Sequence, residues 1–321
     1  MDYVNLGSTG VKVSRICFGT MSFGGDADEA TSHQLFDRCR QAGVNFFDCA
    51  NVYAKGKSEE ILGRLIRSCR DELVITSKVA MPVGDDAKNR GLSRRHIFQQ
   101  IECSLRRLGT DRLDVYFCHH HDLNTPVDET LAAMDVLIRQ GKVLYLGVSN
   151  WMAGEIAYAL GLAQMAKLPI IRVLQPMYNL TKRTAEVEIL PLAQRHGLGV
   201  ICYSPLGGGL LTGKYVQQSP ANARLIANKM YTQRYAEAGH HETAGRFCDY
   251  ARQAGVHPAT LAVAWIMANP AITAPILGAR NLEQLAPSLA AADYKMSPEQ
   301  WREIAALTPP PPVATGRDEE R

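Results

Sequence analysis

The chain of 321 residues lacks several signals that would assign it to a special class of protein. None of its eight cysteines form a C-x-x-C pair, so the spacing of a zinc ribbon is absent. No stretch approaches about 18 uninterrupted apolar residues, and the first residues lack the basic-then-apolar pattern of a signal peptide. This cysteine usage suits a reducing compartment better than a disulfide framework. We therefore expect a cytoplasmic protein that neither spans a membrane nor binds to one.

Strong charge is also missing. The net charge is +3, and no run of Lys or Arg concentrates it into a patch, so a nucleic-acid partner is not expected. The hydrophobic content of 46% is enough for a sizeable buried core. These values leave one large soluble α/β domain or two ordinary ones.

Strand-like and helix-like segments alternate along most of the chain. A short hairpin is expected at residues 3–13, because two strand-like runs flank a Gly-Ser-Thr-Gly turn. Buried strands are predicted near 15–19, 44–47, 73–78, 113–118, 143–148, 170–175, 199–203 and 272–277. Helices are predicted near 28–41, 57–67, 93–108, 127–139, 152–166, 184–196, 240–254, 258–268, 281–291 and 298–307. The rhythm breaks at residues 207–237, which show no strong periodicity.

Eight strands that alternate with helices predict a (β/α)8 TIM barrel with an N-terminal β-hairpin and extra C-terminal helices. A doubly wound sheet is the structural rival, but the Gly-x-Gly-x-x-Gly fingerprint after the first strand is missing. No interdomain linker is visible, so residues 1–308 are interpreted as a single domain. Residues 309–321 are rich in proline and then in charge, and we expect them to be disordered.

Four chemically active side chains follow three successive predicted strands. Asp48 leaves the second strand, and Tyr53 comes five residues later on the loop. Lys78 ends the third strand, and His119 follows the fourth. The carboxyl ends of the strands of a parallel barrel converge on one mouth, so the four side chains are expected to meet there. This convergence indicates an enzyme.

The four side chains together suit the reduction of a carbonyl group. A phenol has an ordinary pKa of about 10, and the ammonium of Lys78 is expected to lower the pKa of Tyr53. Asp48 would hold Lys78 charged, and His119 would orient a polar group of the substrate. This set could protonate an oxygen as negative charge develops on it. No side chain can supply a hydride, so a nicotinamide cofactor is implied.

Each of these residues also has an ordinary interpretation when it is taken alone. Asp48 could be a loop acid, Tyr53 a packing residue and Lys78 a solvated strand end. His119 begins a run of three histidines that is followed by Asp122, which leaves a metal-binding tract as an alternative. Joint placement at three consecutive strand ends favours the catalytic interpretation.

The same residues resemble the aldo-keto reductases, and the resemblance extends over nearly the whole chain. The family signature is matched by Asp48-x-Ala50-x-x-Tyr53-x-x-Gly56-x-Ser58-Glu59, and Lys78 and His119 match by strand position. The opening residues 6–14 and 18–21 are similar to the bacterial and potassium-channel-β-like branch. The resemblance implies that Tyr53 is the general acid, that Lys78 and Asp48 tune it, and that His119 orients the carbonyl.

The resemblance also implies where the nicotinamide end of a cofactor binds. Ser149, Asn150 and Gln175 match positions that hold the nicotinamide amide. Tyr203 matches the aromatic residue that stacks on the nicotinamide ring. Cofactor contacts are further expected at Gly19, Thr20 and Met21.

The remaining cofactor positions belong to the pyrophosphate and the adenosine. Ser204, Pro205, Leu206 and Gly207 match the loop that crosses the pyrophosphate, and residues 207–237 are expected to order over it. Gly278, Arg280 and Gln284 match the site of the adenosine 2′-phosphate and the adenine. One departure is Pro287-Ser288, where many relatives carry Glu-Asn.

Arg280 predicts a preference for NADPH. It stands just before a predicted helix start, where free N–H groups attract anions, and its guanidinium matches phosphate oxygens. Along the chain, no acid stands at the neighbouring positions, and the nearest is Glu283. The sequence thus predicts an NADPH-dependent enzyme that reduces an aldehyde or ketone. The alternative is an NADPH-binding regulatory subunit of the channel-β type with incidental turnover.

Overall fold

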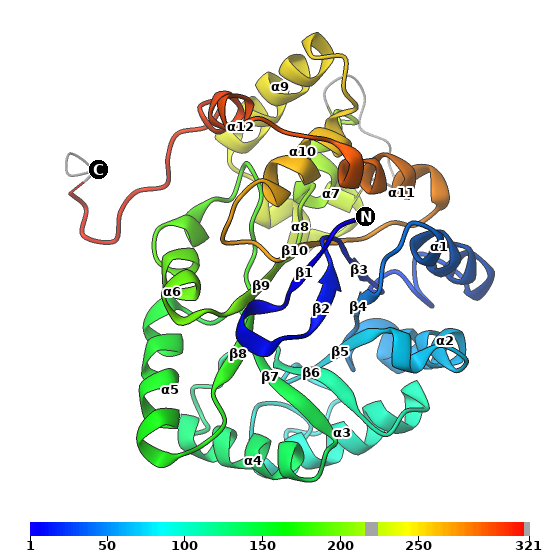
Figure 1. Ribbon diagram of the computed structural model, residues 1–321, viewed down its shortest axis with the longest axis vertical. Helices are drawn as coiled ribbons and strands as arrows, with labels where there is room; N and C mark the ends of the chain where they lie inside the picture. The colour runs from blue at the N-terminus through cyan, green and yellow to red at the C-terminus, as the bar shows by residue number, and fades with distance from the viewer. Residues whose placement is uncertain (216–223, 318–321) are drawn as a thin grey trace.

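Eight parallel strands close into a barrel in the computed structural model, which describes residues 1–215 and 224–317 (Figure 1). The order around the barrel is β3, β4, β5, β6, β7, β8, β9 and β10, and β10 pairs back with β3. The strands are β3 Cys17–Gly19, β4 Phe46–Asp48, β5 Val74–Val79, β6 Leu113–Cys118, β7 Val143–Ser149, β8 Ile171–Gln175, β9 Gly199–Cys202 and β10 Ala274–Leu277. The predicted (β/α)8 barrel is confirmed.

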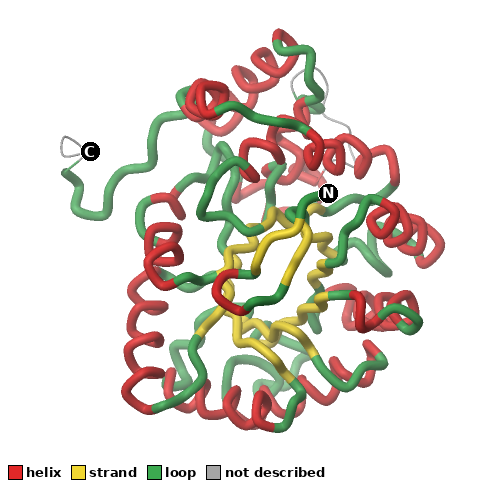
Figure 2. Tube along the Cα trace, in the orientation of Figure 1, coloured by secondary structure: helices red, strands yellow, loops and turns green. Residues whose placement is uncertain are grey.

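The helices surround the strands as an outer ring (Figure 2). The first six are α1 Glu29–Gln41, α2 Lys57–Ile66, α3 Arg94–Leu108, α4 Val127–Arg139, α5 Ala153–Ala166 and α6 Ile189–His196. The later ones are α7 Arg224–Ala227, α8 Lys229–Arg234, α9 Ala238–Gln253, α10 Pro258–Met267, α11 Leu282–Leu289 and α12 Pro298–Ala305. Their ends follow local chemistry. Asp28 Oδ1 accepts a hydrogen bond from Thr31 N (2.8 Å) to cap α1, and Gly109 ends α3 with a φ of 61°.

Two apolar layers hold the barrel together. One fills the barrel interior, and the other lies between the strands and the helices. The side chains of β5 alternate between them, with Val74 in the interior layer and Ile75 in the outer one. Thr76 and Lys78 therefore share the inward face with Val74. This alternation carries a charged side chain into the barrel at the end of β5.

A two-stranded hairpin closes the amino-terminal end of the barrel. It consists of β1 Tyr3–Asn5 and β2 Lys12–Ser14, and it lies across the strands in Figures 1 and 2. Leu6 and Val13 are fully buried and pack with the barrel interior. Gly7 has a φ of +54°, and a Cβ there would lie 2.2 Å from Gly199 N, so the hairpin is seated tightly. The predicted N-terminal hairpin is confirmed, and only the opposite end of the barrel remains for a site.

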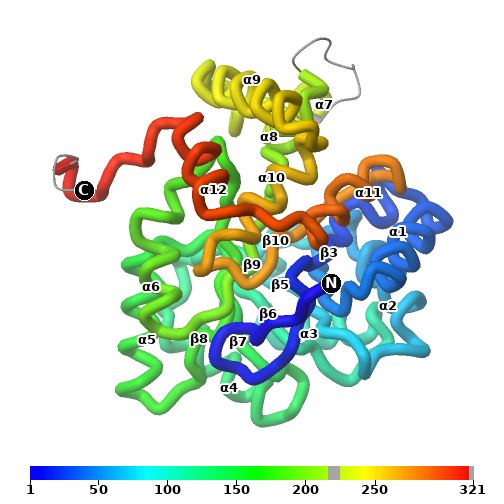
Figure 3. The backbone as a smooth tube through the Cα atoms, turned by 45° about the horizontal axis from the view of Figure 1, so that its top comes forward, coloured from blue at the N-terminus to red at the C-terminus, as the bar shows by residue number. Residues whose placement is uncertain are grey.

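The segment after β9, where the alternation of strands and helices stops, contains more helix than the sequence indicated. The described part of 207–237 contains a 3-10 helix, Gly207–Thr212, followed by α7 and α8. The sequence shows no strong periodicity there, because helices of four to six residues are too short to show a period. Residues 216–223 lie outside the described residues. In Figure 3, α7, α8 and α9 gather on one side of the barrel together with α10 and α12.

One further boundary differs from the prediction, and the tail does not. The helix predicted at 184–196 is divided into a 3-10 helix, Thr184–Glu186, and α6, which begins at Ile189. Residues 309–317 of the predicted tail form neither helix nor strand, and residues 318–321 lie outside the described part. Within the described residues, no helix has both the length and the apolarity that crossing a membrane requires.

Candidate active site

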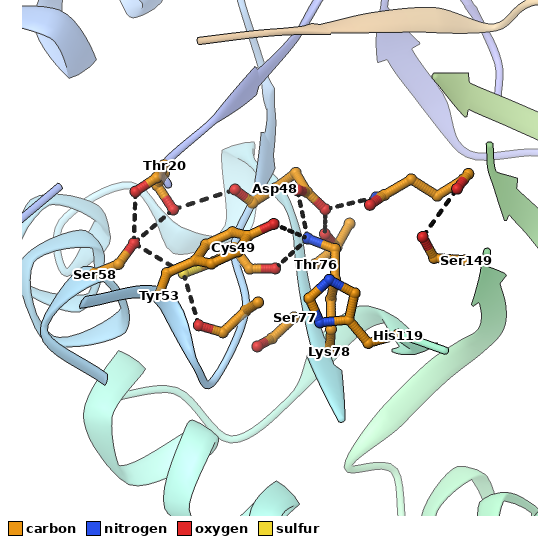
Figure 4. A network of polar contacts seen from close by, with 12 residues as sticks. Thr20, Asp48, Cys49, Tyr53, Ser58, Thr76, Ser77, Lys78, His119 and Ser149 are labelled. Atoms are coloured by element: carbon orange, nitrogen blue, oxygen red, sulfur yellow. Dashed lines mark hydrogen bonds and ion pairs between the residues drawn. The ribbon is translucent and has the colours of Figure 1, made fainter. Parts of the chain in front are cut away.

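A buried ion pair lies at the centre of the barrel mouth. Lys78 Nζ is 2.6 Å from Asp48 Oδ2, and both side chains are almost completely removed from solvent. The ammonium also donates to the carbonyl oxygen of Cys49 (2.7 Å) and to the hydroxyl of Tyr53 (3.1 Å) (Figure 4). All three donors of the ammonium are thus used, as a buried charge requires. The structure brings Asp48, Tyr53 and Lys78 together as the sequence predicted.

The second oxygen of Asp48 is also hydrogen-bonded. Asp48 Oδ1 accepts from Thr76 Oγ1 (2.7 Å) and from Gln175 Nε2 (2.9 Å). Sequence reasoning did not find Thr76. The available signal was its spacing, because Thr76 lies two residues before Lys78 and a strand repeats its face every second residue. These contacts fix the carboxylate from β5 and β8 at once.

The loop that carries Tyr53 is held in a demanding conformation. Ala54 and Lys55 both have positive φ values, 47° and 57°, which cost non-glycine residues about 1–3 kcal/mol each. Ser58, from the signature motif, anchors the loop by donating to Thr20 O (2.7 Å). Thr20 in turn donates its backbone N–H to Asp48 O (2.9 Å). Thr20, expected as a cofactor contact, thus also ties the Tyr53 loop to β4.

Tyr53 does not have the lowered pKa that the sequence argument expected. Burial raises the pKa of Tyr53 to about 12, and the nearby Lys78 ammonium offsets only part of that effect. The expectation was wrong because it weighed the charge and omitted the loss of water around the phenolate. Tyr53 is therefore a neutral phenol over the whole physiological pH range, which is the state a proton donor needs.

The two basic groups of the site differ in charge: His119 is neutral and Lys78 is a cation. Burial lowers the pKa of His119 to about 3, and the positive charge of Lys78 adds to that effect, so the imidazole is neutral. Burial also disfavours the ammonium of Lys78, but Asp48 and Tyr53 together outweigh that effect, and the pKa of Lys78 is raised. The His119 and Tyr53 rings are 6.2 Å apart in an edge-to-face arrangement. A neutral phenol and a neutral imidazole thus line the mouth beside a fixed cation.

The residues expected at the nicotinamide end form one connected chain. Ser149 Oγ donates to the carbonyl oxygen of Gln175 (2.9 Å) and accepts from Asn150 Nδ2 (3.0 Å). Tyr203 donates its hydroxyl proton to Asn150 Oδ1 (2.7 Å). Because Gln175 also donates to Asp48, the chain links the ion pair to the edge of the mouth. The structure therefore brings these four residues together beside the buried ion pair.

The loop expected at the pyrophosphate has the backbone freedom that such a cradle needs. Ser204, Gly207, Gly208 and Gly209 all have positive φ values, between 57° and 96°. Gly207 N–H is used within the loop, where it donates to Ser204 O (2.9 Å). Pro205 and Leu206 lie between these residues and continue the turn. The positive φ values suit a tight turn of the kind that holds a diphosphate, and a Cβ at Gly208 would lie 2.8 Å from Tyr231 Cδ1, so packing within the chain also requires glycine there.

Glycines at the carboxyl ends of two neighbouring barrel strands, β3 and β10, serve different purposes. A Cβ at Gly278 would meet nothing within 4 Å, so the space beside it is open for a ligand. A Cβ at Gly19 would lie 2.7 Å from Ile276 Cγ2, so Gly19 is required for packing against β10. Met21, on the loop after β3, is 41% exposed. Open space beside Gly278 suits the expected nucleotide, whereas Gly19 has a structural reason of its own.

At the adenosine end, Arg280 has an acidic neighbour that reasoning along the chain missed. Arg280 Nε lies 3.0 Å from Asp26 Oδ2, on the loop after β3. Glu283 is the nearest acid to Arg280 along the sequence, but Asp26 contacts it in space. Gln284 Oε1 accepts from the backbone N–H of Arg280 (3.2 Å), so these two expected residues are adjacent. In the departure from the family pattern, Pro287 O accepts from Thr260 Oγ1 (2.6 Å).

The three consecutive histidines do not converge. His120 Nδ1 contacts the carbonyl oxygen of His121, and His121 Nδ1 lies 2.9 Å from Glu155. Both Asp122 oxygens accept hydrogen bonds from neighbouring loop residues. Across residues 1–215 and 224–317, no group of three or more His, Cys, Asp or Glu side chains is placed to hold a metal ion.

The comparisons with known proteins agree with this geometry. A model of the Aldo/keto reductase family matches residues 15–309. This chain belongs to the aldo/keto reductase family. An uncharacterized oxidoreductase of Bacillus subtilis (strain 168), YrpG, is 38% identical over 97% of each chain. The family and this relative support an oxidoreductase, and members of the family generally use NAD(P)H.

Two plant relatives of this aldo/keto reductase family member are named as channel subunits and not as oxidoreductases. A probable voltage-gated potassium channel subunit beta of Oryza sativa subsp. japonica is 37% identical over 98% of this chain and 99% of its own. A protein of the same name from Arabidopsis thaliana is 38% identical over 91% of this chain and 92% of its own. The predicted branch, bacterial and potassium-channel-β-like, is confirmed by these names.

The buried ion pair gives a stability prediction for this family member. Lys78→Met keeps the length of the side chain but leaves the Asp48 carboxylate buried without its cation. We expect the free energy of unfolding, measured with urea, to fall by about 3–5 kcal/mol. As a control, Arg64→Met removes an exposed pair with Glu29 and should cost less than about 1 kcal/mol. Equal losses of unfolding free energy in the two variants would show that the buried pair contributes no more to stability than an exposed one.

The raised pKa of Tyr53 gives a spectroscopic prediction. The phenolate absorbs in the ultraviolet, so the difference between wild type and Tyr53→Phe after a rapid pH jump isolates this one side chain. Because burial disfavours the phenolate, we expect Tyr53 in the free protein to ionise near pH 12. Ionisation of Tyr53 below pH 10, the ordinary value, would contradict the assigned effect of burial.

Proposed function

We propose that this protein is an NADPH-dependent oxidoreductase that reduces aldehydes or ketones to alcohols. The observation that carries the proposal is the hydroxyl of Tyr53, held 3.1 Å from the buried ammonium of Lys78 with a neutral His119 beside it. A phenol that is protonated, next to a fixed cation, is suited to give its proton to an oxygen that becomes negative. The substrate partner is therefore a small molecule with a carbonyl group.

Each side chain has a definite part in such a reaction. NADPH, when bound, supplies the hydride. Tyr53 donates its proton to the carbonyl oxygen, and Lys78 stabilises the phenolate that remains, because its positive charge lies within hydrogen-bond distance. Asp48 keeps Lys78 charged and in place. His119 can donate an N–H to the same oxygen without carrying a charge of its own.

The cofactor assignment depends on the loops at the strand ends. Ser149, Asn150 and Gln175 provide polar groups next to the ion pair, where a nicotinamide amide would bind. The glycine-rich turn after β9 suits the pyrophosphate. Arg280 supplies a guanidinium beside the open space at Gly278, which suits the 2′-phosphate that distinguishes NADPH from NADH.

The second candidate function is that of a cofactor-binding regulatory subunit. The names of the rice and Arabidopsis relatives support it. The complete set of Asp48, Tyr53, Lys78 and His119 supports the enzyme instead. Steady-state turnover of 4-nitrobenzaldehyde with NADPH separates the two functions, because a regulatory subunit would bind NADPH with little turnover.

The eight free thiols support a cytoplasmic location.

The role of Tyr53 gives a kinetic prediction. Tyr53→Phe removes the proton donor and keeps the ring. We expect turnover to fall by roughly 10²-fold or more, the range for loss of a general acid. NADPH binding, followed by fluorescence quenching, should be nearly unchanged, and this measurement is the control for folding. A variant that retained most of its activity would exclude Tyr53 as the acid.

The role of Arg280 gives a binding prediction. Arg280→Ala should weaken NADPH by about 1–3 kcal/mol, the scale of a charged hydrogen bond, and NADH much less. Turnover at saturating NADPH should be retained, because Arg280 does not contact Tyr53. Arg302→Ala, on exposed α12, is the matched control and should change neither affinity. Equal losses for both cofactors would show that Arg280 does not discriminate between them.

A further inference from the structure

Barrel closure brings two loops that are far apart in sequence into contact at the adenosine end. Strand β3 pairs with β10, with Ile276 opposite Cys17 and Leu277 opposite Phe18. The loop after β3, residues 20–28, and the loop after β10, residues 278–281, therefore leave the barrel side by side. Ser22 Oγ donates to Ala279 O at 2.7 Å, in a buried contact. The two loops form one surface beside the position expected for the 2′-phosphate.

The loop after β3 presents Asp26 from a rigid base. Gly24 N donates to Ala27 O (2.8 Å), and Ala27 N donates to Ser22 O (2.9 Å). Phe23 and Ala27 are buried on either side of this turn, and Asp26 is exposed at its tip. The backbone therefore fixes where the carboxylate lies, and its position near Arg280 does not depend on a side-chain rotamer alone.

The contact between Asp26 and Arg280 is close but accessible to solvent. Arg280 Nε and Asp26 Oδ2 are 3.0 Å apart, and the two side chains are 27% and 47% exposed, respectively. An ion pair at such a site contributes little to stability and exchanges readily with other charged groups. A phosphate that approaches Arg280 must therefore come close to the carboxylate as well.

An acid and an arginine at one adenosine site favour opposite cofactors. In dinucleotide sites generally, a carboxylate accepts hydrogen bonds from a bare ribose, whereas an arginine accommodates the 2′-phosphate. A phosphate on Arg280 would add negative charge next to Asp26, and like charges that close repel each other. We infer that Asp26 is a second selectivity-determining residue, which opposes Arg280 and narrows the preference for NADPH over NADH. This inference rests on the proposed nicotinamide cofactor.

The test uses fragments of the cofactor that cannot react. Adenosine 2′,5′-bisphosphate carries the extra phosphate and adenosine 5′-monophosphate lacks it, so calorimetric titration of the full chain measures selectivity without turnover. In Asp26→Asn, the bisphosphate should bind about three- to fivefold more tightly, the scale of a partly exposed charge interaction. The monophosphate should change less than the bisphosphate. The gain should shrink at high salt, because the charges are screened.

A matched control lies two residues away. Asp28→Asn removes the same charge from the same segment, and asparagine also caps a helix well, so α1 keeps its start. This variant should leave the ratio of the two affinities close to that of the wild type. The same gain in Asp28→Asn as in Asp26→Asn would reveal a general charge effect and overturn the inference.

Two other outcomes would also overturn the inference, and they are distinguishable. Weaker binding or an unchanged ratio in Asp26→Asn, with both nucleotides bound by the wild type, rejects the selectivity role and leaves the proposed cofactor intact. Weaker binding of the bisphosphate in particular would mean that Asp26 positions Arg280 for phosphate. If neither nucleotide binds to any variant, the proposed cofactor fails and the inference fails with it.

Discussion

The ion pair between Asp48 and Lys78 is the interaction on which the rest of the site depends. Two opposite charges lie inside the barrel, almost completely removed from solvent, and such a pair is tolerated only when every remaining hydrogen-bonding group has a partner. Thr76 and Gln175 supply partners for the carboxylate, and the Tyr53 hydroxyl is one for the ammonium. These groups come from β5, β8 and the loop after β4. The closed barrel is what brings them together, so the ionised states of Asp48 and Lys78 depend on it.

The burial that strengthens the ion pair also sets the charge of the neighbouring side chains. It keeps Tyr53 protonated and His119 neutral, although the two groups are of opposite chemical type. Burial disfavours the charged form of each, and only Lys78 has a counterion close enough to overcome that effect. The mouth therefore combines one fixed positive charge with two neutral donors, and that combination suits an oxygen which gains negative charge.

The fold and the site could be predicted from the sequence where a pattern along the chain corresponds to a position in space. Alternating strands and helices predicted the barrel, and residues at successive strand ends predicted that Asp48, Lys78 and His119 meet. Asp26 was beyond reach, because its contact with Arg280 exists only through the closure of β3 on β10. The pKa of Tyr53 was misjudged for a related reason, since desolvation depends on packing from all sides. The short helices α7 and α8 left no readable period.

Ring closure has a consequence for how the chain folds. Strand β3 lies near the start of the sequence and β10 near its end, and Arg15 Nη1 donates to the carbonyl oxygen of Ile272, 257 residues away. Contacts of such separation are slow to form, because a long loop must close before they stabilise anything. During synthesis, one edge of β3, the first strand of the barrel, therefore stays unpaired until β10 has been made. An unpaired edge of this kind is where a barrel caught midway would associate with other chains.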